Sequence, residues 1–295
     1  MNAIDVSILI TAYREPDTID LALDAILAQT RSINAEVIVI CPDDATADAA
    51  SAFPGVTVLR DQQRGKPAAL NLGLAKAAGR IIVMTDGDVS VARNALHELL
   101  LPFDDPQIGA VTARPVSVSP RRTMLGYWSH LLTDAGAHEE RSQRNTAGRF
   151  LVCSGYLYAI RTGLVTNIPE DALAEDAVVS QMIAAQGFRV RYAPAAKVMV
   201  KYPQTYRDWL IQKVRSVGGY AQPVIADSPH QMRSFTHEAT AGLRRAFAYP
   251  RSIKEMAWTL ILMAARLHLW LLVFWNVRFL KRPLTDLWER VESTK

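Results

Sequence analysis

Val6-Ser-Ile-Leu-Ile10, near the start of the chain, is a nearly continuous apolar run rich in β-branched residues. Such a run is typical of a strand buried on both faces of a parallel sheet. The pattern then alternates along the chain, predicting further strands at residues 37–40, 56–59 and 81–84 and helices at residues 18–29, 47–52 and 68–78. Four strands alternating with helices predict an α/β fold, a Rossmann-like doubly wound, mostly parallel sheet with helices on both faces.

Composition places the 295-residue chain among ordinary globular proteins, with 49% hydrophobic and 21% charged residues. Its two cysteines, Cys41 and Cys153, cannot form a disulfide framework and have no neighbours at zinc-ligand spacing, so a reducing compartment is expected. The net charge of +4 is unevenly distributed. Residues 1–205 hold 19 Lys and Arg against 22 Asp and Glu, whereas the remaining 90 residues hold 14 against 7. The basic character therefore belongs to the C-terminal third.

The same third contains one long apolar run, residues 256–276, which as a helix would extend about 30 Å. Arg266 interrupts the run at its midpoint, and basic residues flank it on both sides. These features favour a helix in the membrane interface or re-entering from one side, with Trp258, Trp270 and Trp275 as anchors. A single span, or burial against the domain or a partner subunit, stays open. The first residues lack the basic and apolar regions of a signal peptide, so we expect a cytoplasmic domain.

Polar loops follow the first, second and fourth predicted strands, at residues 11–15, at Asp43-Asp44 and at Asp86-Gly87-Asp88. In doubly wound sheets ligands bind beyond the carboxyl ends of the strands, where these loops lie. No Gly-x-Gly-x-x-Gly follows the first strand. Gly65-Lys66 is not a phosphate-binding Walker loop either, because Arg60 and Pro67 occupy its required Gly and Ser/Thr positions. The sequence therefore has neither the dinucleotide-binding motif of a Rossmann domain nor the phosphate-binding loop of a P-loop NTPase.

Three groups of polar residues could carry chemistry. Asp86 and Asp88, with a glycine between them, suit Mg²⁺ or Mn²⁺ bound together with a phosphate, although Asp and Gly are also common in surface turns. Glu175-Asp176 is a second acidic pair, and it could equally be a helix N-terminus. Gln212 and Arg215 share a helical face, which by itself is most simply a solvated face.

In this order the segments resemble the inverting glycosyltransferases of family 2, which have the GT-A fold. The resemblance covers about residues 5–220 and is greatest to the processive branch that makes chitin, hyaluronan, cellulose and poly-N-acetylglucosamine. It rests on seven matched segments along the chain, which are residues 6–15, Asp43-Asp44-Ala-Thr-Ala-Asp48, Arg64-Gly-Lys-Pro-Ala-Ala-Leu-Asn71, Asp86-Gly-Asp88, Cys153-Ser-Gly-Tyr-Leu-Tyr-Ala-Ile-Arg161, Glu175-Asp176 and Gln212-Lys-Val-Arg215.

The resemblance implies a nucleotide-sugar donor, with a UDP-sugar favoured, and a divalent cation, Mg²⁺ or Mn²⁺. It implies Asp176 as the catalytic base and Asp86 and Asp88 as metal ligands. The remaining positions that it implies fall into three groups, namely Thr11, Tyr13, Glu15, Asp43, Lys66 and Asp86 at the nucleotide, Ser154, Gly155, Tyr156 and Glu175 at the acceptor or sugar, and Gln212 and Arg215 at the diphosphate.

Two departures limit the resemblance. Ser216 stands where the processive enzymes have a Trp, and no amino-terminal membrane helices precede residue 5, so we expect no channel formed by this chain alone. The predicted organisation is a catalytic domain at 1–220, a basic linker with helices at 221–255, an apolar membrane-associated segment at 256–280 and a cytoplasmic tail at 281–295.

The predicted activity is sugar transfer to a lipid-linked or polysaccharide acceptor at the cytoplasmic face of the membrane, by a peripheral or monotopic protein. A catalytic subunit whose partner forms the channel is the alternative within the family. A nucleotidyltransferase would need a Gly-rich loop after the first strand, where the chain has Ala12-Tyr-Arg-Glu15. A nucleic-acid binder should line a groove with basic residues, whereas here they flank an apolar segment, so no nucleic-acid partner is expected.

Overall fold

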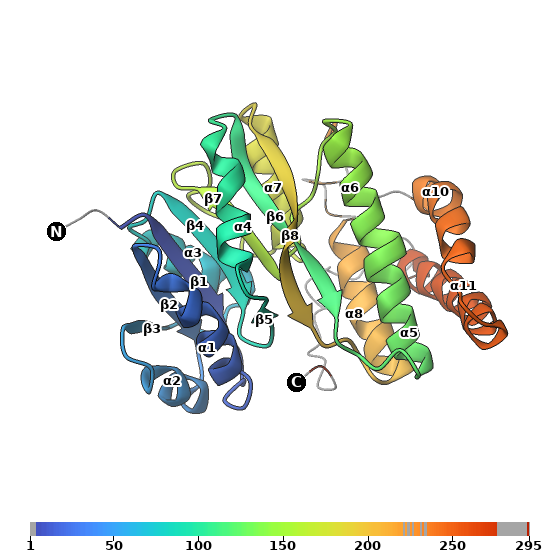
Figure 1. The fold of residues 1–295 in the computed structure, drawn as a ribbon, viewed down its shortest axis with the longest axis horizontal. Helices are drawn as coiled ribbons and strands as arrows, with labels where there is room; N and C mark the ends of the chain where they lie inside the picture. The colour runs from blue at the N-terminus through green and yellow to red at the C-terminus, as the bar shows by residue number, and fades with distance from the viewer. Residues whose placement is uncertain are drawn as a thin grey trace.

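The computed structural model describes residues 4–220, 222, 225, 227–230, 232, 235–275 and 294 (Figure 1). Its strands form one sheet, and they are β1 (Val6–Thr11), β2 (Ala35–Cys41), β3 (Val56–Arg60), β4 (Ile81–Asp86), β5 (Ser90–Val91), β6 (Ile108–Ser117), β7 (Leu157–Arg161) and β8 (Arg189–Val200). The helices of the sheet region are α1 (Ile19–Thr30), α2 (Asp44–Ser51), α3 (Lys66–Lys76), α4 (Ala95–Leu100), the 3₁₀ helix η1 (Leu101–Asp104) and α7 (Glu175–Ala185). A second group consists of α5 (Met124–Leu131), the π-helix η2 (Leu132–His138), α6 (Glu139–Thr146), α8 (Tyr206–Gly219), α10 (Phe235–Ala248) and α11 (Ile253–Phe274).

The strand order in the sheet is β3-β2-β1-β4-β7-β6-β8-β5. The four strands predicted from the sequence are confirmed. β1, β3 and β4 extend one or two residues further at their C-terminal ends, and β2 extends further at both ends. β1 pairs in parallel with β2 and with β4, and β2 pairs in parallel with β3. Beyond β4 the sheet is mixed, because β7 runs antiparallel to both β4 and β6 while β6 and β8 are parallel. The first half is thus the predicted doubly wound unit, extended by a second set of strands.

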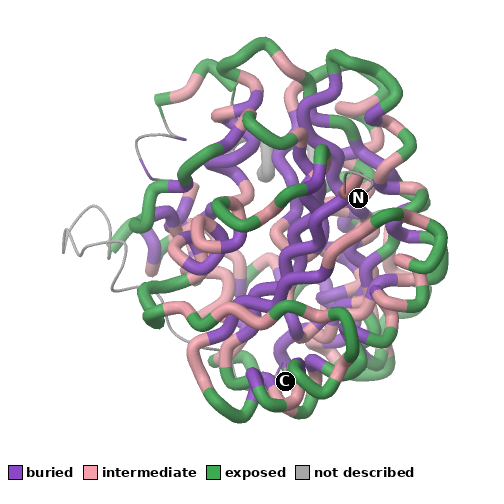
Figure 2. The backbone as a smooth tube through the Cα atoms, turned by 90° about the vertical axis from the view of Figure 1, so that its left-hand side faces the viewer, coloured by how far each residue is buried: buried purple, intermediate pink, exposed green. Residues whose placement is uncertain are grey.

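Helices cover both faces of the sheet, as predicted. All six residues of β1 are buried, and its four apolar residues alternate between two cores. Ile8 and Ile10 pack on the side of α1 and α4, whereas Leu9 packs on the side of α3 and α7. Figure 2 shows the result, with buried strands through the centre and exposed segments around the periphery. This burial on two faces explains why β1 has apolar residues on both of its faces.

A third core lies beside the sheet, where α5, α8 and α11 meet. Tyr127 and Trp128 of α5 and Leu262 of α11 have no exposed surface. The Arg121 guanidinium, just before α5, donates two hydrogen bonds to the Glu255 carboxylate of α11, at 2.9 and 3.0 Å. In Figure 1, α5, η2 and α6 form one continuous helical rod that lies alongside α8. The C-terminal helix is therefore seated on the same helices that border the sheet.

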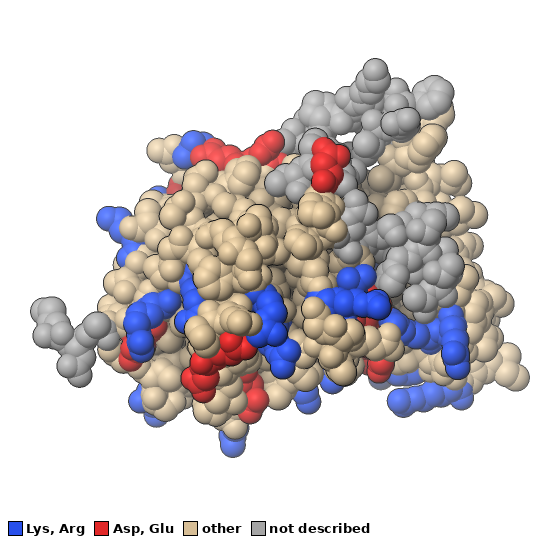
Figure 3. All heavy atoms as spheres, turned by 90° about the horizontal axis from the view of Figure 1, so that it is seen from above, with Lys and Arg blue, Asp and Glu red and all other residues tan. Residues whose placement is uncertain are grey.

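Helix α11 contains most of the predicted apolar segment, and it is long and apolar enough to cross a membrane. Its buried residues recur every three or four positions along most of its length, at Thr259, Leu262, Ala265, Leu269 and Val273. The opposite face is apolar and exposed, with Leu260, Leu267 and Leu271 each more than half exposed. Figure 3 shows few charged side chains at the right-hand edge, where α11 lies, and Lys and Arg beside it. The predicted tail, 281–295, lies outside the described residues apart from residue 294.

Candidate functional site

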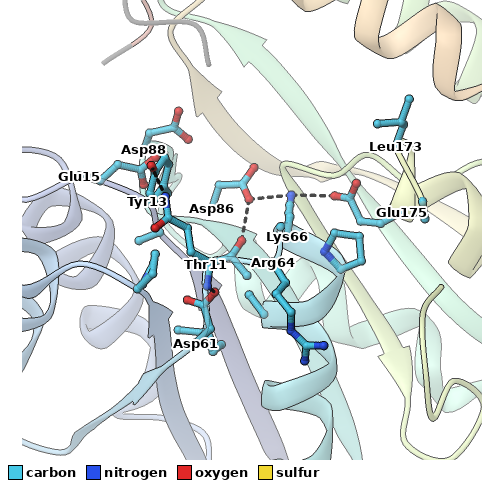
Figure 4. A pocket seen from close by; sticks show the side chains of 18 of the residues that line it. Thr11, Tyr13, Glu15, Asp61, Arg64, Lys66, Asp86, Asp88, Leu173 and Glu175 are labelled. Carbon is cyan, nitrogen blue, oxygen red and sulfur yellow. Dashed lines mark hydrogen bonds and ion pairs between the residues drawn. The ribbon is translucent and has the colours of Figure 1, made fainter. Parts of the chain in front are cut away.

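A cavity of about 500 Å³ opens at the carboxyl ends of β1 and β4, in the place expected for a doubly wound sheet (Figure 4). Its walls come from the loops after these two strands, the start of α3, the segment before α7 and one face of α8. Ten residues that the sequence selected line it, namely Thr11, Tyr13, Glu15, Lys66, Asp86, Asp88, Tyr156, Glu175, Gln212 and Arg215. The fold thus collects residues that are far apart in the sequence around one space large enough for a nucleotide sugar.

The register of β1 and β4 places the first polar residues side by side. Thr11 and Asp86 are paired positions at the ends of these strands, and the Thr11 hydroxyl donates to the Asp86 carboxylate at 3.1 Å. Gly87 follows, and a Cβ atom there would lie 2.7 Å from a Glu15 carboxylate oxygen and 2.8 Å from the Ala12 Cβ. Only glycine fits this approach without displacing its neighbours. The loop after β4 therefore packs on the loop after β1, which brings Asp88 to the cavity with Asp86.

Lys66 lies between two carboxylates at the centre of the site. It begins α3 directly after Gly65, whose φ of 100° is in the region that favours glycine. The Lys66 ammonium is 2.7 Å from the Asp86 carboxylate and 2.8 Å from the Glu175 carboxylate, as the dashed lines in Figure 4 show. Burial disfavours the charged form, but these two ion pairs outweigh it and hold the pKa of Lys66 well above its usual value. Lys66 thus stays protonated and joins the two acidic pairs.

Asp176 lies on the wall of a second cavity, of about 240 Å³, which adjoins the first. Ser154 and Gly155 also line this smaller cavity, and Lys66, Tyr156, Glu175 and Arg215 are among the residues that line both. The two carboxylate oxygens of Asp176 accept hydrogen bonds from the backbone N–H groups of Gly155 and Ala177, each at 2.8 Å.

The partly buried position of Asp176 gives it an unusual affinity for protons. Burial raises its pKa to about 6, and the neighbouring negative charge of Glu175 acts in the same direction, while the Lys66 ammonium and the two backbone hydrogen bonds oppose the shift. A carboxylate with a pKa near 6 is mostly ionised at neutral pH and is a stronger base than an exposed aspartate. The arrangement can therefore accept a proton from a group bound in the smaller cavity.

Gln212 and Arg215 lie one turn apart on α8, and both border the two cavities. The Gln212 side-chain oxygen is buried and has no hydrogen-bond partner among the residues that the structure describes. A buried acceptor without a donor is unfavourable, so a bound molecule that donates to it would be stabilised there. Arg215 adds a planar cation suited to paired phosphate oxygens. Arg215 is therefore compatible with the predicted diphosphate contact, whereas the Gln212 oxygen would need a donor, such as a sugar hydroxyl, that an ionised diphosphate does not offer, and the contact predicted for Gln212 stays a prediction.

Asp43 is the one predicted site residue that lines neither cavity. It is the N-cap of α2, where its carboxylate accepts hydrogen bonds from the Thr46 backbone N–H at 3.0 Å and the Thr46 hydroxyl at 2.7 Å. The backbone N–H of Arg14 donates to its other oxygen at 2.8 Å. The side chain thus ties α2 to the loop after β1, and a contact with a nucleotide base stays a prediction.

Sequence reasoning did not select five charged residues that line the larger cavity, namely Asp61, Arg64, Glu170, Asp171 and Lys201. Arg64 and Glu170 form an ion pair at 3.2 Å across its mouth, between the loop before α3 and the segment before α7. Arg64 is the first residue of one matched segment, and Glu170 is close to Glu175 in the sequence. Their position beside selected motifs was the only sequence feature that could have indicated them. Their pairing could not be seen because more than a hundred residues separate them.

The acidic groups were also considered as ligands for a divalent cation. Within the described part of the chain, no group of three or more His, Cys, Asp and Glu side chains could hold a metal by itself. Asp86 and Asp88 supply two carboxylates at the larger cavity. Mg²⁺ is commonly held by one or two protein carboxylates together with substrate phosphates and water, so this donor set fits a cation shared with a phosphate ligand.

Comparison with known proteins agrees with this geometry. The family model described as "Glycosyltransferase like family 2" matches residues 3–219. The chain is 25% identical over 233 residues to the poly-beta-1,6-N-acetyl-D-glucosamine synthase of Staphylococcus aureus, a match that covers 75% of this chain and 56% of the synthase. It is also 25% identical over 229 residues to the probable glycosyltransferase YdaM of Bacillus subtilis, covering 72% and 54%. The chain thus spans about half the length of the curated relatives it matches.

Solved structures show the same fold. The mannosyltransferase PcManGT from Pyrobaculum calidifontis, in complex with GDP-Man and Mn2+, has a TM-score of 0.62 at 24% identity, covering 96% of this chain and 82% of that protein. Glucosyl-3-phosphoglycerate synthase from Mycobacterium tuberculosis, in complex with Mn2+ and UDP-glucose, has a TM-score of 0.53 at 19% identity, covering 73% and 77%. With the family model covering most of its length, the chain belongs to glycosyltransferase family 2 and is a glycosyltransferase with homology to a polysaccharide synthase.

Proposed function

We propose that this glycosyltransferase moves a sugar from a nucleotide-sugar donor, with a UDP-sugar favoured, to a lipid-linked or polysaccharide acceptor, with inversion at the anomeric carbon. The observation that carries the proposal is the pair of adjoining cavities with Asp176 on the wall of the smaller one. The donor would occupy the larger cavity and the acceptor the smaller. Lys66 and Glu175 lie where the two spaces meet, so the reacting atoms would come together there.

The donor half provides charges that match a departing nucleoside diphosphate. When the bond between the anomeric carbon and the diphosphate oxygen breaks, negative charge builds on phosphate. Lys66 and Arg215 would stabilise that charge from the cavity wall. Asp86 and Asp88 would hold Mg²⁺ or Mn²⁺, which supplies further charge neutralisation. The proposal therefore includes dependence on a divalent cation, in keeping with the Mn2+ named for two structural relatives.

The acceptor half provides a base. The oxygen of an acceptor hydroxyl would attack the anomeric carbon as its proton passes to Asp176, forming one carbon–oxygen bond while the bond to the diphosphate breaks. A single displacement of this kind inverts the anomeric centre and requires no second nucleophile. The raised pKa of Asp176, about 6, suits a base that works near neutral pH.

The homology to a polysaccharide synthase favours a second reading within the same family. The chain would then be the catalytic subunit of a synthase whose partner forms the membrane channel. Both readings predict the same donor chemistry, and they differ in whether product accumulates as single transfers or as long chains. Product size, measured on a gel or by mass spectrometry, separates them.

A panel of UDP-, GDP- and dTDP-sugars with Mg²⁺ or Mn²⁺ tests the donor. We expect one class of donor to raise the melting temperature of the full chain and to be hydrolysed slowly in the absence of acceptor, both only with a divalent cation. Stabilisation follows because a ligand that binds only the folded state shifts the unfolding equilibrium. The absence of a response to every donor would contradict the proposed function.

Attachment to the cytoplasmic face of a membrane is the remaining part of the proposal. The inner face of α11 is packed on α5 and α8 over most of the length of the helix, so we favour a helix lying in the interface over one that crosses the bilayer. Its exposed leucines would enter the lipid, and nearby Lys and Arg would contact anionic headgroups.

Flotation with anionic liposomes tests this attachment on the full chain. The triple variant Leu260→Glu, Leu267→Glu, Leu271→Glu changes only the exposed face of α11, so the core beneath stays intact. Leu21→Glu is the matched control, because Leu21 is 66% exposed on α1, an element outside that core. We expect the wild type and the control to float and the triple variant to remain at the bottom. Equal flotation of all three would contradict membrane binding by α11.

A further inference from the structure

Arg141 is a buried cation that forms no ion pair with the residues that the structure describes. It lies in α6, is 5% exposed and lines the smaller cavity. Its Nε donates a 3.4 Å hydrogen bond to the Val152 carbonyl, and it forms no ion pair with any side chain in the described part of the chain. Arg144, one turn further on, is by contrast bound to Glu140 at 2.6 Å. A buried charge is normally paired, so an anion bound in the smaller cavity would be stabilised by the Arg141 guanidinium.

Trp209 provides an independent observation in the same cavity. It is 4% exposed, and its indole N–H has no hydrogen-bond partner among the residues described. The neighbouring Trp128, whose ring meets that of Trp209 edge-on at 5.4 Å, donates its own N–H to the Trp258 carbonyl at 2.8 Å. Buried indole N–H groups usually find an acceptor. Two buried side chains with N–H donors therefore border the smaller cavity. In the described part of the chain the Trp209 N–H has no partner, and the Arg141 guanidinium has one 3.4 Å hydrogen bond and no ion pair.

The rest of the wall is partly apolar. Leu125 of α5, Leu132 of η2 and Pro115 of β6 line the cavity together with the Trp209 ring. The wall on this side is the continuous rod of α5, η2 and α6, and π-helical segments such as η2 are frequent at functional sites. Apolar surface beside an unpaired cation matches a molecule that is itself part apolar and part anionic.

We propose that the acceptor is an amphiphile that carries a phosphate or phosphodiester group, held by Arg141, with its apolar part along Leu125, Leu132 and Trp209. This inference rests on the proposed function and names the class of acceptor. The carboxylates of Glu175 and Asp176 line the same cavity, and they repel an anion. The phosphate is therefore held away from the base, and a hydroxyl of the same molecule gives its proton to Asp176. The phosphate itself is unchanged by the reaction.

Binding of simple probes to the full chain tests the proposal by calorimetry, without a donor. Octyl phosphate combines the anion and the chain, octyl β-glucoside has the chain without the charge, and inorganic phosphate has the charge without the chain. We expect octyl phosphate to bind most tightly. Arg141→Gln should weaken the binding of octyl phosphate about tenfold or more, the usual scale for hydrogen bonds between charged groups. Arg149→Gln, the same change at an exposed position outside both cavities, should leave it unchanged.

Further variants separate a binding role from a structural one. Arg141→Lys keeps the charge and should recover part of the affinity that Arg141→Gln loses, whereas Trp209→Phe keeps the ring and should weaken octyl phosphate about threefold or more. Melting curves identify any variant that fails to fold. In that case the relative affinities of the wild type for octyl phosphate, octyl β-glucoside and inorganic phosphate test the proposal.

Three results would overturn the inference. Octyl glucoside binding as tightly as octyl phosphate would exclude an anion site. Inorganic phosphate binding as tightly as octyl phosphate would exclude the apolar part of the ligand. Displacement of octyl phosphate by UDP with Mn²⁺ would place it in the larger cavity. Failure of the proposed function appears separately, as no response in the nucleotide-sugar panel.

Discussion

The substitution Asp176→Asn tests the base directly. Asn has nearly the same shape, and its side-chain oxygen can still accept one of the two 2.8 Å backbone hydrogen bonds that Asp176 receives. It cannot accept the acceptor's proton. A positioned general base contributes a factor of about 10² to 10⁴, so kcat should fall by that amount while nucleotide-sugar binding is retained.

The pH dependence provides a second, sharper expectation. Burial and the charge of Glu175 raise the pKa of Asp176 to about 6, so its reactive ionised form is lost as the pH falls through that value. At pH 5 only about one molecule in ten would carry the ionised base, and each further pH unit would lower the rate about tenfold. In Asp176→Asn this acid limb should be absent, because the group that titrates has been removed.

The assay is transfer of radiolabelled sugar from the donor that the panel identifies, measured at saturating substrate from pH 5 to pH 8. Asp20→Asn is a matched control, since Asp20 also lies in the first turn of a helix but is exposed and outside both cavities. It should retain wild-type rates and the wild-type profile. Near-normal turnover in Asp176→Asn, or an acid limb that persists in this variant, would refute the assignment of the base.

Three further changes test other parts of the site and its support. Lys66→Met should move the acid limb of kcat upward by about one pH unit or more, because the Lys66 ammonium lowers the pKa of Asp176; an unmoved limb would show that the two groups are uncoupled. Asp88→Ala should weaken nucleotide binding only when Mg²⁺ or Mn²⁺ is present, and calorimetry that finds equal affinities would contradict a role as metal ligand. Leu262→Ala removes a fully buried side chain between α11 and its neighbours and should lower the free energy of unfolding in urea by about 2 to 5 kcal/mol; a loss below about 1 kcal/mol would contradict this packing.

The sequence predicted the first half of the sheet because those strands are buried on both faces. Their apolar runs, such as Ile81–Met84 within β4, stand out from the polar loops around them. The later strands were not predicted. In β8 buried and exposed residues are mixed and Pro194 interrupts the run, so no continuous apolar signal exists. The antiparallel placement of β7 between β4 and β6 depends on pairings such as Ile82 with Ile160, which only the folded chain reveals.

The site divides in a similar way. Asp86, Lys66 and Asp176 could be selected because each lies in a short motif and the motifs occur in a fixed order along the chain. Asp43 shows the limit of that reasoning, since an aspartate directly before a helix is also a strong N-cap, and here it caps α2. Arg141 could not be selected at all. Its surroundings, Glu139-Glu-Arg-Ser-Gln-Arg144, have the composition of a solvated helix, and only the packing of the folded chain shows that Arg141 is buried.

The position of Lys66 between Asp86 and Glu175 links substrate binding to proton binding. Any donor phosphate that draws the ammonium toward itself weakens the pair with Glu175, and the uncompensated negative charge beside Asp176 then increases that residue's affinity for a proton. Thermodynamic linkage makes the effect reciprocal, so protonation of Asp176 must alter donor affinity by the same factor. One lysine would thereby strengthen the base when the donor is in place, and the enzyme would favour an order of events in which the donor arrives before the acceptor.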